Sequence, residues 1–125
     1  MHIVIDTNAL IRFFTNDIPQ KANLLEKLLK EKKHIFVPDV VFPELEYIFV
    51  YQYKFPRKKL LKIFTFLVSQ SNIDTTYQAK TAIFIFEKSK LDMADSIIAA
   101  YSLKGKLASF DKKLLQVEGA SPFWK

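Results

Sequence analysis

Four acidic residues, Asp6, Glu44, Asp95 and Asp111, each stand where a strongly apolar run meets a helix start or a turn. Acids at the ends of buried strands are held in place by the fold, whereas acids on a solvated surface are not. If the fold gathers them, two unit charges about 4 Å apart repel by roughly 4 kcal/mol at an effective dielectric near 20. A divalent cation or a proton relieves such repulsion. This placement constrains the fold more than any other feature of the chain.

The pattern of apolar residues predicts strands that alternate with helices over one domain, residues 1–125. Strands are expected at 2–5, 34–37, 71–74 and 106–110, with an edge strand at 120–123. Helices are expected at 7–14, 18–32, 38–53, 57–69, 76–88, 92–104 and 111–115. Pro43 falls inside the third of these, so it lies in the first turn or marks a kink. The alternation indicates an α/β fold with parallel βαβ units, whose ligands bind beyond the carboxyl ends of the strands.

The chain carries a net charge of +6, and among its 19 basic residues only Arg12 and Arg57 are Arg. Lys meets phosphate as a point charge, so this balance is typical of a backbone contact with nucleic acid or, equally, of a Lys-rich solvated surface. The lack of Cys excludes disulfides and thiolate zinc and agrees with a reducing compartment. The sequence has no signal peptide pattern and no long apolar run, and we expect a soluble cytoplasmic protein.

Each acid also has an ordinary structural interpretation. Asp6 and Asp111 suit helix N-caps, and Glu44 suits a solvated first turn. Asp92 and Asp95, three residues apart, suit a capping pair at the start of a helix. Oxygen ligands in a chain without Cys and with 2 His favour Mg²⁺ or Mn²⁺ over Zn²⁺. A metal-filled acidic pocket in a basic protein is typical of phosphodiester chemistry.

Nearly the whole chain resembles the PIN domain family, especially the VapC-type toxins of prokaryotic toxin–antitoxin pairs. The resemblance is carried by the runs 3–8, 40–45, 92–100 and 107–111, of which the first and third are the most specific. It implies a three-layer α/β/α fold with a central, mostly parallel sheet of four to five strands. It also implies a metal-dependent endoribonuclease that hydrolyses single-stranded RNA with one or two Mg²⁺ or Mn²⁺ ions. A cognate antitoxin is the protein partner that it implies.

In this family the acids that match bind the metal. Carried over to this chain, the catalytic acids are Asp6, Glu44, Asp95 and Asp111, with Asp92 as an auxiliary metal ligand. Ser109 stands where Thr is common, which keeps a hydroxyl, and Pro43 directly before Glu44 is unusual. The side chains expected to hydrogen-bond ligands or the scissile phosphate are Thr7, Asn8 and Ser109. The cations expected to contact RNA are Arg12, Lys112 and Lys113, although Lys112 and Lys113 suit a solvated surface equally well.

Three other interpretations of the chain are alternatives to this one. A response-regulator receiver needs an acidic pair after its first strand, and a haloacid-dehalogenase-type phosphatase needs Asp-x-Asp, which Asn8 interrupts. A catalytically silent PIN-like module that binds RNA or protein is the main alternative, and the complete acidic set argues against it. The helices between Glu44 and Ser69 carry more apolar side chains than one buried face needs. They predict a homodimer or, alternatively, a helix pair sandwiched within the monomer.

Overall fold

The computed structural model describes residues 3–124. The chain divides into two compact units, Met1–Thr75 and Thr76–Lys125. The strand predicted at 2–5 is observed at Ile3–Val4, and His2, its first predicted residue, lies outside the described residues. No helix within residues 3–124 is long and apolar enough to cross a membrane.

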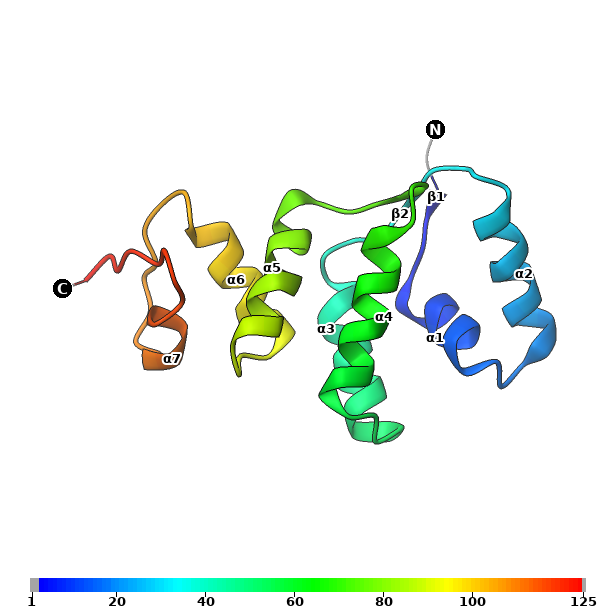
Figure 1. Cartoon of the computed structure of the whole chain (residues 1–125), viewed down its shortest axis with the longest axis horizontal. Helices are drawn as coiled ribbons and strands as arrows, with labels where there is room; N and C mark the ends of the chain where they lie inside the picture. Colours follow the sequence, from blue (N-terminus) through cyan, green and yellow to red (C-terminus); the bar gives the residue numbers. More distant parts are fainter. Residues whose placement is uncertain (1–2, 125) are drawn as a thin grey trace. The chain divides into compact units, whose positions relative to one another are not determined.

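The first unit contains a parallel sheet whose strands follow the order β1, β2, β3. Figure 1 labels β1 and β2 of this sheet. These strands are β1 (Ile3–Val4), β2 (Ile35–Phe36) and β3 (Ile73–Asp74). The backbone N–H of Ile5 donates to the carbonyl of Phe36 at 3.1 Å, and that of Val37 to Asp74 at 3.0 Å. Because parallel strands end at one edge of a sheet, the segments after β1 and β2 leave it from the same side.

Helices of the first unit connect and cover these strands. They are α1 (Thr7–Thr15), α2 (Pro19–Lys30), α3 (Val41–Glu46), η1 (Tyr47–Gln52) and α4 (Arg57–Ser69). The single helix predicted at 38–53 is an α-helix followed by the π-helix η1, in which the N–H of Tyr53 donates to the carbonyl of Ile48 at 3.2 Å. Pro43 lies in the first turn of α3, where a missing N–H removes no helical hydrogen bond.

Phenylalanine side chains dominate the core of the first unit. Phe42, Phe49 and Phe64 are fully buried. The rings of Phe42 and Phe64 meet edge to face at 5.4 Å, and Phe49 stacks on Phe55 at 5.0 Å. Some of the apolar side chains that predicted a dimer are therefore buried inside this unit. Three large side chains of the same region stay exposed, Tyr47, Tyr51 and Tyr53.

The second unit is helical. Its elements are α5 (Tyr77–Lys88), α6 (Met93–Ser102) and α7 (Lys112–Leu115). Helix α5 packs against α6, and α6 contacts α7. Thr76 caps α5, because its hydroxyl accepts a hydrogen bond from the N–H of Ala79 at 3.0 Å. Phe86 and Met93 are fully buried and form the centre of this unit.

The predicted number of strands, four to five, is wrong: the described residues form three. The segments predicted as strands at 106–110 and 120–123 meet only in an isolated parallel bridge between Leu107 and Pro122. Pro122 has no N–H with which to extend a ladder. On the other side, the hydroxyl of Ser109 accepts from the N–H of Asp111 at 3.0 Å, which turns the chain into α7. The α/β class and the parallel sheet agree with the prediction.

Candidate active site

Asp6 stands between β1 and α1. Its backbone is extended, with φ −99° and ψ 171°, and its Oδ1 accepts a hydrogen bond from the N–H of Ala9 at 2.9 Å. The predicted N-cap role is therefore confirmed. Asp6 and Asn8 are both exposed, beside the carboxyl end of the first strand.

Glu44 is tied to the segment that follows Asp6. The hydroxyl of Thr7, which is buried, donates to Oε1 of Glu44 in α3, across 37 residues of sequence. The remainder of Glu44 is exposed. This bond fixes the orientation of Glu44 and brings its carboxylate to the start of α1. The unusual Pro43 before it is accommodated in the first helical turn.

An open pocket lies beside these two residues. Its volume is about 460 Å³. The pocket is lined by the start of α1 and by one face of α3 and η1: Thr7, Asn8, Ile11, Pro43, Glu44, Tyr47, Ile48 and Gln52. Two predicted polar residues and one predicted acid thus share one concave surface, and that surface also presents an aromatic ring and a side-chain amide.

The other three predicted acids belong to the second unit. Asp92 caps α6, with its Oδ1 accepting from the N–H of Asp95 at 2.8 Å. Asp111 caps α7, with its Oδ1 accepting from the N–H groups of Lys113 at 2.9 Å and Leu114 at 3.2 Å. The predicted cap roles of Asp92 and Asp111 are therefore also confirmed. Each cap uses Oδ1, and the helix N-terminus favours the negative charge there.

Among the predicted acids of the site, Asp95 is the one that is half-buried, whereas Asp6, Glu44, Asp92 and Asp111 are exposed. Burial raises the pKa of its carboxyl, and the negative charges of Asp92 and Asp111 raise that pKa further. The charges of Asp92 and Asp111 therefore act on the carboxyl of Asp95. Since ionised Asp95 is disfavoured by burial and by like charge, a proton or a cation at this place would be favoured.

The chemistry of these acids fits a hard divalent ion, because every side-chain donor is an oxygen. The mutual repulsion around Asp95 is a further observation in favour of a cation. Against it, no group of three His, Cys, Asp or Glu side chains within residues 3–124 is arranged to hold a metal ion. The structure brings Glu44 to the start of α1 in the first unit, and in the second unit it places Asp95 where the charges of Asp92 and Asp111 raise its pKa.

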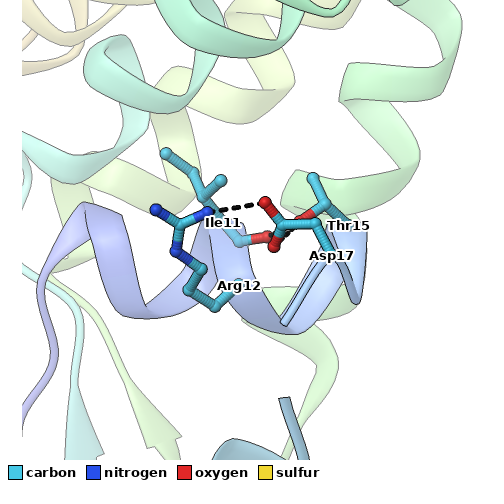
Figure 2. A network of polar contacts seen from close by, with 4 residues as sticks. All are labelled: Ile11, Arg12, Thr15 and Asp17. Carbon is cyan, nitrogen blue, oxygen red and sulfur yellow. Dashed lines mark hydrogen bonds and ion pairs between the residues drawn. The ribbon is translucent and has the colours of Figure 1, made fainter. Parts of the chain in front are cut away.

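Of the three cations expected to contact RNA, Arg12 is already engaged within the first unit. Figure 2 shows its Nη1 directed at Oδ2 of Asp17, at 2.6 Å. The hydroxyl of Thr15 donates to Oδ1 of the same carboxylate at 3.0 Å. Loss of hydration alone would raise the pKa of Asp17, but the Thr15 hydrogen bond and the Arg12 charge outweigh it and lower the pKa. By contrast, Lys112 and Lys113 are exposed in α7, directly after Asp111.

Three features of the site were not predicted from the sequence: Tyr47 and Gln52 in the pocket wall, and the Arg12–Asp17 ion pair. For Tyr47 a signal existed, because it follows Glu44 by three residues and so shares its helix face. For Gln52 no such signal existed, since its position depends on the wider turn of η1. The ion pair joins residues five apart across the end of α1, a spacing that helix periodicity does not flag.

Asp6 follows β1 of the parallel sheet and caps α1, and Asp92 and Asp111 cap helices of the second unit. The model of the PIN domain matches residues 3–120, and the chain belongs to the PIN domain family. PIN domains are generally nucleases, and the nucleases among them usually use divalent metal ions. No curated protein matches the chain significantly.

Proposed function

We propose that this chain is a metal-dependent endoribonuclease of the VapC type, the toxin of a toxin–antitoxin pair. The observation that carries the proposal is the lack of cation partners around the predicted acids. Within residues 3–124, none of the five forms an ion pair with Lys or Arg, in a chain with 19 such cations. Other acids do so, as Glu26 does with Lys30 at 2.8 Å. Acids kept free of Lys in so basic a chain suit an external cation.

In this proposal the two units form one nuclease domain over residues 1–125, as the family match across both units supports. Asp6, Glu44, Asp95 and Asp111, with Asp92 as auxiliary, would hold one or two Mg²⁺ or Mn²⁺ ions. When bound, such an ion activates water for attack on phosphorus and stabilises the leaving oxygen.

The remaining polar residues position these acids and the RNA. Thr7 fixes the carboxylate of Glu44 through its hydroxyl. Asn8 and Ser109 donate hydrogen bonds to the phosphate that is cleaved. Lys112 and Lys113 contact neighbouring phosphates of the RNA backbone, and Arg12 can do so only when its pair with Asp17 opens. Because water attacks and not the 2′-hydroxyl, the products carry 5′-phosphate and 3′-hydroxyl ends.

A cleavage assay on single-stranded RNA tests this function. Cleavage should require Mg²⁺ or Mn²⁺, stop in excess EDTA and disappear in Asp6→Asn, which removes charge with little change in size. Products with cyclic phosphates, or full activity of Asp6→Asn, would contradict the mechanism. An end-group analysis of the fragments decides between water and the 2′-hydroxyl as nucleophile.

A catalytically silent RNA- or protein-binding module is the second candidate. It is favoured by one observation, that no group of three acidic or imidazole side chains within residues 3–124 is arranged to hold a metal ion. Calorimetric titration with Mn²⁺ separates the two candidates. Heat of binding in the wild type that is lost in Asp95→Asn supports the nuclease, whereas RNA binding without any binding of Mn²⁺ supports the silent module.

The toxin proposal includes a cognate antitoxin and places the activity in the cytoplasm, where its RNA substrate is. An antitoxin segment with a Lys or Arg tip would suit the acids, and acidic residues around that tip would suit a chain of charge +6. Expression of the chain alone should slow growth, whereas Asp95→Asn should not. Equal toxicity of the two chains would separate growth arrest from catalysis.

We further propose a homodimer through the segment between Glu44 and Ser69, supported by the exposed Tyr51 and Tyr53. Phe49 lies in the core, so a charged substitution there would unfold the unit and could not test the dimer. Light scattering over a dilution series is the direct test. A single species of 14.6 kDa at every micromolar concentration would contradict the dimer.

A further inference from the structure

The pocket beside Glu44 has a composition that suits an uncharged ring better than a phosphate. Its apolar walls come from Ile11, Pro43 and Ile48, and its charged side chain is the carboxylate of Glu44. Among the described residues that line it, none is Lys or Arg. A phosphate placed there would meet a negative charge and no cation. A flat neutral group would bury apolar area against the walls.

Tyr47 supplies an exposed aromatic face at this pocket. Tyr47 is 61% exposed as a residue, and Tyr51, four residues later on η1, is 64% exposed. The two ring centroids are 5.5 Å apart and the rings are tilted by 41°, so the rings contact each other without stacking face to face. Exposed aromatic rings beside a concave surface are the usual stacking platforms for unpaired bases.

Two side-chain amides complete the pocket. Asn8 lies at the start of α1 and Gln52 at the end of η1, and both line it. An amide carries donors and an acceptor, which match the edges of nucleobases. The π-helical turn of η1 is what brings Gln52 to the same wall as Tyr47, and such turns are frequent at functional sites.

We propose that this pocket receives one unpaired nucleobase of the RNA, stacked on Tyr47 with its edge toward Gln52. The inference rests on the proposed ribonuclease function and adds a base-binding subsite to it. Because Glu44 lines the same pocket, the base belongs to a nucleotide next to the cleaved bond. A volume of about 460 Å³ accommodates one nucleotide, and a base in a duplex could not enter it without unpairing.

The test combines protein variants with RNA that lacks single bases. Tyr47→Ala is compared with Tyr47→Phe, which keeps the ring, and with Tyr77→Ala, which removes a tyrosine that is 72% exposed at the start of α5. Short single-stranded RNAs carry an abasic site at each position around the cleaved bond in turn. Binding is measured in the Asp95→Asn background with Mg²⁺ present, and cleavage is measured in the active chain.

Tyr47→Ala should weaken RNA binding by about 5- to 150-fold, the usual effect of losing one stacked base. Tyr47→Phe and Tyr77→Ala should bind as the parent chain does. At one RNA position, an abasic site should weaken binding to the parent chain by the same factor. The same abasic site should not weaken binding to Tyr47→Ala any further, because the base and Tyr47 are the two partners of one contact. Gln52→Ala should reduce the preference among the four bases at that position.

The inference is overturned if no abasic position loses its effect in Tyr47→Ala. Cleavage by the wild type together with such a result would remove the subsite alone and leave the nuclease function intact. Absence of RNA binding in every arm would remove both. If Tyr47→Ala instead lowers the mass seen by light scattering and leaves RNA binding unchanged, Tyr47 is a contact between two copies of the chain, which also overturns the inference.

Discussion

Asp92 allows the structural and the chemical role of one acid to be measured separately. Its Oδ1 accepts from the N–H of Asp95 at 2.8 Å and caps α6, while its charge raises the pKa of Asp95. Asp92→Asn keeps an oxygen for the cap and removes the charge. Asp92→Ala removes both. The difference between the two variants therefore isolates the cap, and the difference between Asn and the wild type isolates the charge.

The expected sizes follow from these contacts. Loss of an N-cap oxygen costs about 1 kcal/mol, so Asp92→Ala should unfold about 3–6 °C below Asp92→Asn in a chain of this length. Without metal, Asp92→Asn loses the attraction between its charge and the helix N-terminus but relieves the repulsion on Asp95, and this relief should leave its melting temperature at or above that of the wild type. Because the pKa of Asp95 is raised in the folded state, its carboxyl contributes stability at pH values below its pKa in the unfolded chain. This contribution is lost as the pH rises through its pKa in the folded state. The advantage of Asn over the wild type should therefore be largest at neutral pH and shrink on acidification.

Calorimetric melts in EDTA and in Mn²⁺ provide the measurement. Ligand binding raises the melting temperature by mass action, so a bound ion should raise that of the wild type and raise those of both Asp92 variants less. Thr76→Ala is the matched control, because it removes the cap of α5 and leaves every predicted acid in place. It should melt lower and keep the full response to Mn²⁺. An Asn variant as unstable as Ala would refute the cap account, and equal Mn²⁺ responses in all four chains would refute the metal role.

Three further predictions address other contacts. Asp95→Asn should stabilise the metal-free chain at neutral pH in thermal melts, since its pKa is raised, and should lower RNA cleavage by at least about 100-fold. Thr7→Val should cost about 1 kcal/mol of stability in denaturant titrations and lower cleavage by about 10- to 100-fold, with a higher Mg²⁺ requirement, because Glu44 loses its orienting bond; an unchanged requirement would exclude that role. Asp17→Asn should free Arg12 and steepen the salt dependence of RNA binding by about 0.7 in log–log slope, whereas an unchanged slope would mean that Arg12 contacts no phosphate.

Local signals in the sequence were sufficient for most helices. The apolar stripe of 57–69 predicts α4 with the observed bounds, and the residue types at Asp6, Asp92 and Asp111 suit the N-caps that the structure shows. Strands were less predictable, because a strand exists only where a partner supplies its hydrogen bonds. The segment at 106–110 is apolar enough to form one, but it finds a partner for a single residue pair. Apolar character alone therefore gave too many strands.

The sequence predicted which residues belong to the site better than it predicted which of them contact each other. Asp6, Glu44 and Asp92 could be named from the runs around them, whereas the bond from Thr7 to Glu44 spans 37 residues and leaves no local pattern. The sequence also did not predict the π-helical geometry of η1, because its residues would suit an α-helix equally well. The pocket next to Glu44 depends on both of these features, and for this reason only part of its lining was named from the sequence.

The structural and functional interpretations of these acids support each other. Asp6, Asp92 and Asp111 each accept a backbone hydrogen bond through Oδ1, which orients the carboxylate and reduces its rotamer freedom. A helix N-terminus also offsets part of the cost of holding like charges together. A carboxylate paired with Lys has its charge compensated, so it has little left to offer an ion. Capping by backbone N–H groups orients the carboxylate without a neighbouring cation, so the N-cap is the means by which this fold can present charged acids to a cation.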